Sequence, residues 1–283
     1  MLKWSEYYKN CQDAYATSKD KPLIYDLGLI SLNDNLTLGL DAQYHSSIEE
    51  IREKVINNFS ENGMTNQINA FSIKTATQLM PEIAKVCDKY FRDFLQEKVF
   101  GSYVYCDNIK IYKTPKGAQR NESSWLWHID NNPKEQVKIM LYLSDVNSNS
   151  GPLQYIQDPL GSAVKATTRR VDYTNWCTSK GMHSTKYCSW HSSRVPMSAI
   201  EAMKNFGCKQ VSICGKIGTA TLFDNNIVHR GALPTGKDRL AMTLQFRPSK
   251  EAKRSLVDPK YTGDGWKHTT FNMDPSIEHI KEA

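Results

Sequence analysis

A histidine and an aspartate stand two residues apart in the stretch SSWLWHIDNN, at His128 and Asp130. On an extended strand alternate side chains share one face, so an imidazole and a carboxylate at this spacing can reach the same point. Trp125 and Trp127 would then point to the opposite face, where large aromatic rings can pack. Because an H-x-D triplet also arises by chance in a chain of this length, it needs a further ligand before it indicates a metal site.

The further ligand is a histidine about a hundred residues later. His229 lies in GTATLFDNNIVHRGALPTGKDRLAMTLQF, after one strand-like run and before another. Two histidines and one carboxylate on one face of an octahedral Fe(II) ion leave three positions for a bidentate keto acid and for oxygen. Zinc is the competing metal, but a structural zinc ion usually takes a fourth protein ligand, and no cysteine stands near these residues. We therefore expect His128, Asp130 and His229 to bind Fe(II).

An arginine follows His229 by ten residues and begins the run RLAMTLQF. Its guanidinium group stays protonated at physiological pH and pairs with a carboxylate through two hydrogen bonds. We expect this residue, Arg239, to bind the far carboxylate of 2-oxoglutarate while the keto acid end chelates the metal. Thr243 lies on the same strand face and is expected to add a hydroxyl hydrogen bond. Arg230 is a rival anchor, but adjacent residues of a strand point to opposite sides.

Two helical stretches precede these residues. Residues 46–59 begin with Ser46 as an N-cap and repeat Ile48, Ile51 and Val55 at helical spacing. A second helix is predicted between about 73 and 100, with Pro81 in its first turn or at a kink. Its apolar residues recur every three to five positions, at Leu79, Ile83, Val86, Tyr90, Phe94 and Val99.

After Gly101 the periodicity changes to short runs rich in Val, Ile and Tyr, which predict β-strands. The runs are SYVYCDNIKIYKT, EQVKIMLYLSD, PLQYIQD, KQVSICGKIG, GTATLFDNN and RLAMTLQFRP. In the first run Asn108, Lys110 and Tyr112 share a face, which either contacts the keto acid or is exposed. We therefore predict a mainly β chain with flanking helices, in which the N-terminal helices pack on one sheet.

One enlarged domain over residues 1–283 is the expected organisation, because β-rich barrels and sandwiches reach this size. It divides into an N-terminal helical region (1–100), a β core (101–160 and 211–248), an insertion or lid (161–210) and a C-terminal surface tail (249–283).

Within the insertion, Ser198 to Glu201 form a capping box for a short helix that ends at Gly207. His183 and His191 either pack at the surface or line the substrate pocket.

Composition excludes several other classes of protein. The formal net charge of +6 is spread along the sequence, which fits an acidic small molecule better than a nucleic acid. Seven cysteines without a C-x-x-C pair indicate neither a disulfide framework nor a zinc knuckle, so we expect a reducing cytoplasm. No stretch is apolar enough for a membrane span. The expected partner is a small-molecule substrate, and the oligomeric state stays open.

The ligand set and its spacing resemble the Fe(II)/2-oxoglutarate-dependent dioxygenases, and the fuller pattern is similar to the phytanoyl-CoA dioxygenase-like family. The similarity is carried by W-H-x-D at 127–130, by LYLSD and by SGPLQYI, and it covers roughly 101–160 and 211–248. One departure is that residues 157–160 (QDPL) stand where the family usually has P-G-S-H.

The resemblance implies a double-stranded β-helix, or jelly roll, with the metal at its open end. It also implies Fe(II), 2-oxoglutarate and O2 as cofactor and co-substrates, and hydroxylation of a C–H bond with release of succinate and CO2. Asp130 favours hydroxylation over halogenation, because related halogenases have a small residue at this position. Two alternatives stay open, namely a non-catalytic β-helix binding module, and a cupin-like metalloenzyme that does not use 2-oxoglutarate and keeps Arg239 for a structural ion pair.

Overall fold

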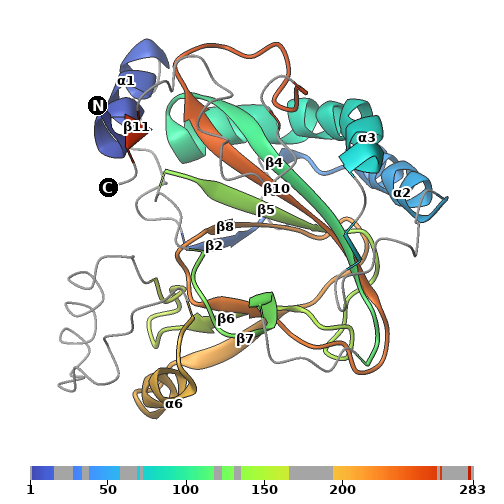
Figure 1. Cartoon of the computed structure of the whole chain (residues 1–283), viewed down its shortest axis with the longest axis vertical. Helices are drawn as coiled ribbons and strands as arrows, with labels where there is room; N and C mark the ends of the chain where they lie inside the picture. Colours follow the sequence, from blue (N-terminus) through green and yellow to red (C-terminus); the bar gives the residue numbers. More distant parts are fainter. Residues whose placement is uncertain are drawn as a thin grey trace.

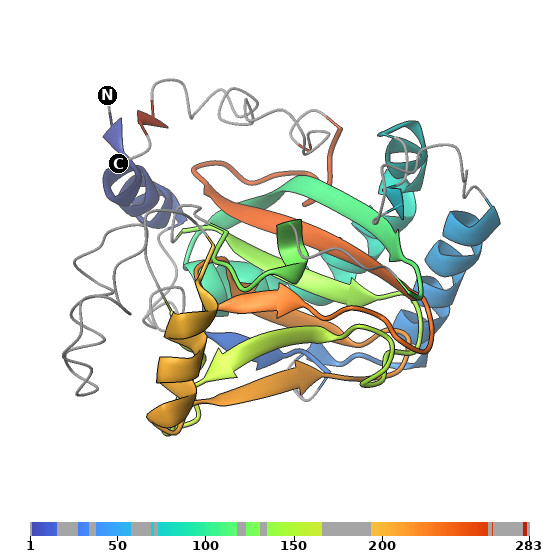
Figure 2. The same ribbon diagram turned by 60° about the horizontal axis from the view of Figure 1, so that its bottom comes forward.

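Two antiparallel sheets dominate the computed structural model. It describes residues 2–15, 28–33, 38–57, 69–70, 73–117, 123–130, 135–165, 194–259, 262 and 280–281. The larger sheet has six strands in the order β2-β8-β5-β10-β4-β3, and the smaller sheet has three in the order β7-β6-β9. In Figures 1 and 2 the two sheets lie one over the other, with α2 and α3 beside the larger sheet and α6 beside the smaller one. The predicted mainly β architecture with helices is therefore present.

All six predicted strand runs form strands. The larger sheet consists of β2 (Leu29–Ser31), β8 (Ala220–Asp224), β5 (Val137–Tyr142), β10 (Arg239–Ser249), β4 (Tyr103–Thr114) and β3 (Asn69–Ala70). The smaller sheet consists of β7 (Lys209–Ile213), β6 (Leu153–Gln157) and β9 (His229–Gly231). A parallel pair joins β1 (Leu2–Lys3) to β11 (Ile280–Lys281). The strand β9 was not predicted, because three residues are too few to show a period.

The helices lie mainly in the N-terminal third of the chain. They are α1 (Trp4–Tyr15), α2 (Ala42–Asn57), α3 (Ile73–Val86), the π-helical segments η4 (Cys87–Phe91) and η5 (Phe94–Phe100), the short 3-10 helix η6 (Ser123–Trp125) and α6 (Met197–Asn205). None of the helices in the described ranges has the length and apolar content needed to cross a bilayer.

The first predicted helix starts four residues earlier than its sequence pattern indicated. Asp41 Oδ1 accepts a hydrogen bond of 2.9 Å from the backbone N–H of Tyr44, so Asp41 and not Ser46 caps the N-terminus of α2. The added turn is held by the buried Tyr44, whose hydroxyl donates to the carbonyl oxygen of Gly218 at 2.9 Å. The predicted apolar face is confirmed, since Ile48, Ile51 and Val55 are fully buried.

The second predicted helix is confirmed over 73–100, although its geometry changes along the way. Pro81 stands eight residues after Ile73, in the interior of α3 and exposed, so the prediction of a first-turn proline was wrong. After Val86 the turns widen into the two π-helical segments, and the stretch ends at Gly101 in a left-handed conformation (φ 59°). The six residues predicted from the spacing are all buried.

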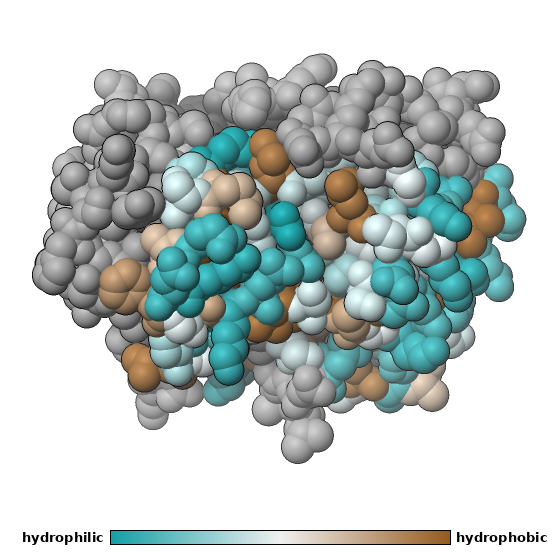
Figure 3. Space-filling view, turned by 90° about the horizontal axis from the view of Figure 1, so that it is seen from below, coloured by the Kyte–Doolittle hydropathy of each residue, from teal (hydrophilic) through white to brown (hydrophobic). Residues whose placement is uncertain are grey.

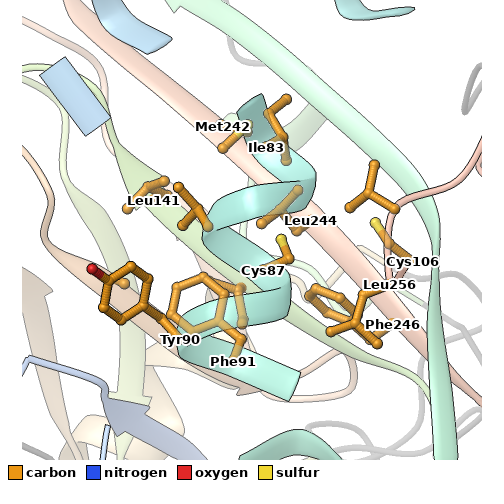
Figure 4. Packing of buried hydrophobic residues seen from close by; sticks show 14 of the residues in the cluster. Ile83, Cys87, Tyr90, Phe91, Cys106, Leu141, Met242, Leu244, Phe246 and Leu256 are labelled. Atoms are coloured by element: carbon orange, nitrogen blue, oxygen red, sulfur yellow. The ribbon is translucent and has the colours of Figure 1, made fainter. Parts of the chain in front are cut away.

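The main apolar core lies between these helices and the outer face of the larger sheet. Figure 4 shows Ile83 and Cys87 from the helical stretch next to Met242 and Leu244 of β10. All four are almost completely buried. Burial of apolar side chains from both elements therefore stabilises the packing of the helical stretch on this face of the sheet.

The short helix α6 begins at Met197, preceded by Pro196, without a side-chain cap. The capping box predicted at Ser198 is therefore absent, whereas the predicted stop holds, because Gly207 has a left-handed φ of 88°. The buried face of α6 packs with Trp127 and Ile129.

On the side of α6, the part of the surface formed by described residues carries no large apolar patch. Figure 3 shows this side, where hydrophilic side chains gather over the middle of the described surface and hydrophobic ones form small separate areas. Residues 166–193 of the predicted insertion, with His183 and His191, lie outside the described residues.

Candidate metal centre

Backbone pairing brings the two candidate histidines together. The N–H of His128 donates to the carbonyl oxygen of His229 at 2.9 Å, and the N–H of His229 donates back at 3.0 Å. The segment of His128 thus adds a short fourth row to the smaller sheet beside β9. The N–H of Asp130 donates to the carbonyl oxygen of Asn225 at 2.9 Å. The positions of all three candidate ligands therefore depend on backbone hydrogen bonds and not on loop conformation alone.

The three side chains converge on one point. One ligand atom from each of His128, Asp130 and His229 lies within 4.8 Å of the others. The Nε2 atom of His128 is 3.8 Å from Asp130 Oδ1, and that of His229 is 3.6 Å from Asp130 Oδ2. Such a group of two imidazoles and one carboxylate has the donor set that a divalent transition metal binds on one face.

Each imidazole is oriented by its other nitrogen. Nδ1 of His128 lies 2.8 Å from the carbonyl oxygen of Leu126, and Nδ1 of His229 lies 2.8 Å from that of Ile227. A carbonyl oxygen only accepts, so Nδ1 carries the proton in both rings and donates it. Both Nε2 atoms are then left with a lone pair directed at the third ligand, as a metal requires.

Burial and neighbouring charges together keep these groups in the protonation states that metals bind. It lowers the pKa of His128 to about 3, with the neighbouring imidazole of His229 acting in the same direction. It also lowers the pKa of His229. For Asp130 burial acts upward, but the charges of Lys138 and the two histidines outweigh it and hold the pKa below its ordinary value. Near neutral pH the cluster therefore offers two neutral imidazoles and one carboxylate.

Lys138 is a neighbour of this cluster that the sequence pattern did not single out. Its Nζ lies 2.6 Å from Asp130 Oδ2, and each of the two side chains is 16% exposed. The residue stands on β5 opposite Gln245 of β10, on the inner face of the larger sheet. Strand alternation places Lys138 on the face of Met140, but only the pairing between distant strands brings its ammonium group to Asp130.

Arg239 is buried at the start of β10 and is 3% exposed. Nη1 donates to the carbonyl oxygen of Gly151, and Nη2 donates to Thr114 Oγ1 at 3.3 Å. No carboxylate of the described residues forms an ion pair with it, and its buried Nε finds no acceptor among them. A buried guanidinium group without an acidic partner is costly, and an exogenous carboxylate would offset that cost.

A second unsatisfied donor lies beside this arginine. The indole Nε1 of Trp125 is buried and has no acceptor among the described residues. A Cβ atom placed on Gly231 would lie 3.2 Å from Arg239 Nη2 and 3.5 Å from Trp125 Cδ1, so the two side chains meet over the glycine. Trp125 therefore faces the arginine. The expectation that it points to the opposite side of a strand was wrong, because the residue belongs to the 3-10 helix η6. Trp127 does pack on the opposite face.

Thr243 shares the inner face of β10 with Arg239, but four residues of strand, roughly 13 Å, separate them. Tyr112 spans part of this gap. Its ring centre lies 5.7 Å from Arg239 Cζ, and its hydroxyl oxygen lies 3.4 Å from Thr243 Oγ1. Thr243 is thus connected to the arginine through Tyr112.

The rival arginine points away from the cluster. The guanidinium carbon of Arg230 lies 4.5 Å from the ring centre of Trp127, and its Nε donates to Gln154 Oε1 at 2.9 Å. Because Trp127 packs beneath α6 on the outer face of the smaller sheet, Arg230 belongs to that face as well. Arg230 and its neighbour His229 thus point to opposite sides of the strand, as strand alternation predicted.

Comparison with known proteins gives likenesses of structure only. No family model matches the sequence, and the search of curated proteins gives no match. The structure of EctD from S. alaskensis with bound Fe is 14% identical, with a TM-score of 0.47, and the likeness covers 81% of this chain and 76% of that one. HygX from Streptomyces hygroscopicus with nickel and 2-oxoglutarate bound is 15% identical, with a TM-score of 0.47, over 84% and 89% of the two chains.

A third likeness is to the epimerase SnoN in complex with Fe3+, alpha ketoglutarate and nogalamycin RO, at 12% identity and a TM-score of 0.43, over 85% and 83% of the two chains. At such low identities and TM-scores, the assignment of a function depends on the chain's own residues.

Proposed function

We propose that the protein is a non-haem Fe(II)- and 2-oxoglutarate-dependent oxygenase that hydroxylates a C–H bond of a small molecule. The observation that carries the proposal is the convergence of His128, Asp130 and His229, together with a buried Arg239 that forms no ion pair with any described carboxylate. These three residues would hold the iron, and Arg239 would hold the far carboxylate of 2-oxoglutarate. Bound Fe(II) would supply the activation of oxygen, with succinate and CO2 as the products of the keto acid.

The residues around Arg239 prepare the site for a carboxylate before it arrives. Arg239 Nε and Trp125 Nε1 are buried donors that a carboxylate would satisfy, which offsets the cost of their burial. Gly231 leaves the space in which these two side chains meet. Thr243 and Tyr112 supply hydroxyl groups on the same inner face, and Thr243 is proposed as a further hydrogen-bond donor to 2-oxoglutarate.

The finer classification belongs to the same proposal. The two facing sheets would close as a double-stranded β-helix, with the N-terminal helices on the outer face of the larger sheet, in a single domain of the phytanoyl-CoA dioxygenase-like type. The pairing of His128 with β9 supports this, because it extends the smaller sheet toward four strands. The chain would be cut into the regions predicted above, with 161–210 as an insertion over the site.

The two alternatives explain less of the site. A metalloenzyme that does not use 2-oxoglutarate would keep Arg239 for a structural ion pair, but no described carboxylate pairs with it. A non-catalytic binding module would not need two imidazoles whose Nδ1 atoms are both fixed by backbone carbonyl groups.

Anaerobic titration of the purified chain with Fe(II) and then 2-oxoglutarate tests the proposal. We expect the weak visible charge-transfer band of the iron chelate, and we expect its loss in His229→Ala. His45→Ala is the matched control, because His45 is exposed on α2, away from the cluster, and its removal should leave the band intact. Absence of the band in the wild type, or its survival in His229→Ala, would overturn the proposal.

A further inference from the structure

The turn between β8 and β9 contacts two of the three candidate ligands through its backbone. The carbonyl oxygen of Asn225 accepts the backbone N–H of Asp130 at 2.9 Å. Two residues later, the carbonyl oxygen of Ile227 lies 2.8 Å from Nδ1 of His229 and accepts its proton. A shift of this one turn would therefore move both Asp130 and the ring of His229.

The turn is shaped by local hydrogen bonds and anchored by a contact of longer range. Asp224 Oδ1 accepts the N–H of Asn226 at 2.8 Å, and the Asp224 carbonyl oxygen accepts that of Ile227 at 3.2 Å. The anchor is Asn225, whose Nδ2 donates to the backbone carbonyl oxygen of Gln136 at 2.9 Å and lies 3.3 Å from Gln136 Oε1. The amide of Asn225 thus connects the turn to the residue that precedes β5.

This contact continues across the larger sheet as a row of buried polar side chains. Gln136 Nε2 donates to Asp107 Oδ2 at 3.1 Å, and the same carboxylate forms an ion pair with Arg247. Asp107 is the extra residue of β4 at the β-bulge opposite β10. The row consists of four side chains that are each at most 4% exposed, namely Arg247, Asp107, Gln136 and Asn225. It therefore runs from β4 and β10 to the turn that contacts Asp130.

Stability alone does not explain a polar row at these positions. Replacing a buried ion pair or amide by apolar groups of similar shape is often neutral or stabilising. Connected hydrogen bonds instead restrict the segments that carry them to one arrangement. Gln136 also stands two residues before Lys138, whose Nζ lies 2.6 Å from Asp130 Oδ2. Asp130 is thus held at its carboxylate by Lys138 and at its backbone by Asn225.

We propose that Asn225 is a positioning residue of the candidate metal centre. It holds the turn between β8 and β9 so that Asp130 and His229 are directed at the same ion, and Gln136 acts through it. The inference rests on the proposed function and adds to it a side chain that is not itself a ligand. The affinity and geometry of the bound metal should depend on Asn225, whereas Arg239 lies at the opposite end of β10 from this row.

The test is a titration of the full chain with Co(II), followed by calorimetry and by the visible d–d bands of the ion. In Asn225→Ala we expect Co(II) to bind about tenfold more weakly, as when a partner of a metal ligand is removed, and the bands to shift with the ligand geometry. Gln136→Met should weaken binding less, because Asn225 keeps its hydrogen bond to the backbone. The double variant should bind no more weakly than Asn225→Ala, because Gln136 acts through Asn225.

Asn33→Ala is the matched control. Asn33 Oδ1 accepts the backbone N–H of Ala220 at 2.7 Å, so this asparagine also holds the backbone of β8, but at the end far from the turn. We expect Asn33→Ala to keep the Co(II) affinity and bands of the wild type. An equal weakening in Asn33→Ala would show that any loosening of β8 has the same effect, and would overturn the inference.

Unchanged Co(II) affinity and bands in Asn225→Ala would also overturn it and leave the proposed function standing, since a role in stability alone lowers only the free energy of unfolding. The proposed function fails instead if Fe(II) and 2-oxoglutarate give no chelate band, and the Co(II) titration still decides the positioning role. If circular dichroism shows that Asn225→Ala does not fold, Gln136→Met decides, because methionine retains the length of the side chain. Unchanged Co(II) binding in that folded variant would then contradict the inference.

Discussion

The two faces of the larger sheet serve different purposes, although they are made by the same strands. On the outer face of β10, Met242 and Leu244 are fully buried against the helices. On the inner face, Arg239 and Thr243 stand in the same strand, with polar partners. Alternation along a strand allows adjacent residues to meet an apolar core and a polar site. Stability and ligand binding should therefore respond to different substitutions in one strand.

The largest effect on stability is expected on the outer face. Leu244→Ala removes a fully buried side chain and should lower the free energy of unfolding by about 2–5 kcal/mol. Because Leu244 points away from the inner face, the affinity for 2-oxoglutarate should not change. Urea denaturation and anaerobic titration measure the two quantities. Thr243→Ala on the same strand is the control, and an equal loss of stability in that variant would contradict the separation of the two faces.

The largest effect on ligand binding is expected on the inner face. Arg239→Met should lower the affinity for 2-oxoglutarate about 100-fold, because the carboxylate loses a charge-assisted pair. The free energy of unfolding should fall little, since the variant also removes a buried charge that pairs with no described carboxylate. Fe(II) binding should persist. If the affinity for 2-oxoglutarate is unchanged, the anchor lies elsewhere.

Lys138 makes the separation less simple, because it stands on the inner face and contacts the candidate ligand Asp130. Lys138→Met should weaken Co(II) binding about 10- to 100-fold, the range found when a partner of a metal ligand is removed. Lys138→Arg should restore much of the affinity, since a guanidinium group can donate to the same oxygen. Calorimetry with Co(II) measures this, and tighter binding by Lys138→Met would show that the ammonium group competes with the metal.

The last effect expected is a pH dependence of the stability of the metal-free chain, which appears only below neutral pH. The pKa of His128 is lowered from 6.5 to about 3 and that of His229 is lowered too, so the unfolded chain binds these protons before the folded chain does. Stability should therefore fall as the pH drops below about 6.5, by up to about 1.4 kcal/mol per pH unit for each histidine. Urea midpoints at pH 7, 6 and 5 measure the slope, and His128→Gln should reduce it. Urea midpoints that do not change with pH would mean that the imidazoles are not buried away from water.

Local patterns were enough to predict much of the fold. Apolar spacing predicted the buried faces of α2 and of the 73–100 helical stretch, and alternation predicted six strands. The helix starts were less predictable, because the Asp41 cap depends on Tyr44 reaching Gly218, which is 174 residues away in the chain. A local sequence motif contains no information about that contact.

The candidate site was predictable only in part, for a related reason. The types and spacing of His128, Asp130 and His229 indicated the cluster, and the structure does bring them together. Lys138 was missed, because it reaches the cluster through the register between strands. Register is a long-range property that the period of a single strand does not reveal.

The mutual backbone hydrogen bonds of His128 and His229 have a consequence for folding. These residues are about a hundred positions apart, and in the structure their rings are brought together by the pairing of the His128 segment with β9. Contacts of such long range form slowly, because a large loop must close first. The ability to capture a metal should therefore arise late in refolding, after the helices, and its time course would report the pairing of the His128 segment with β9.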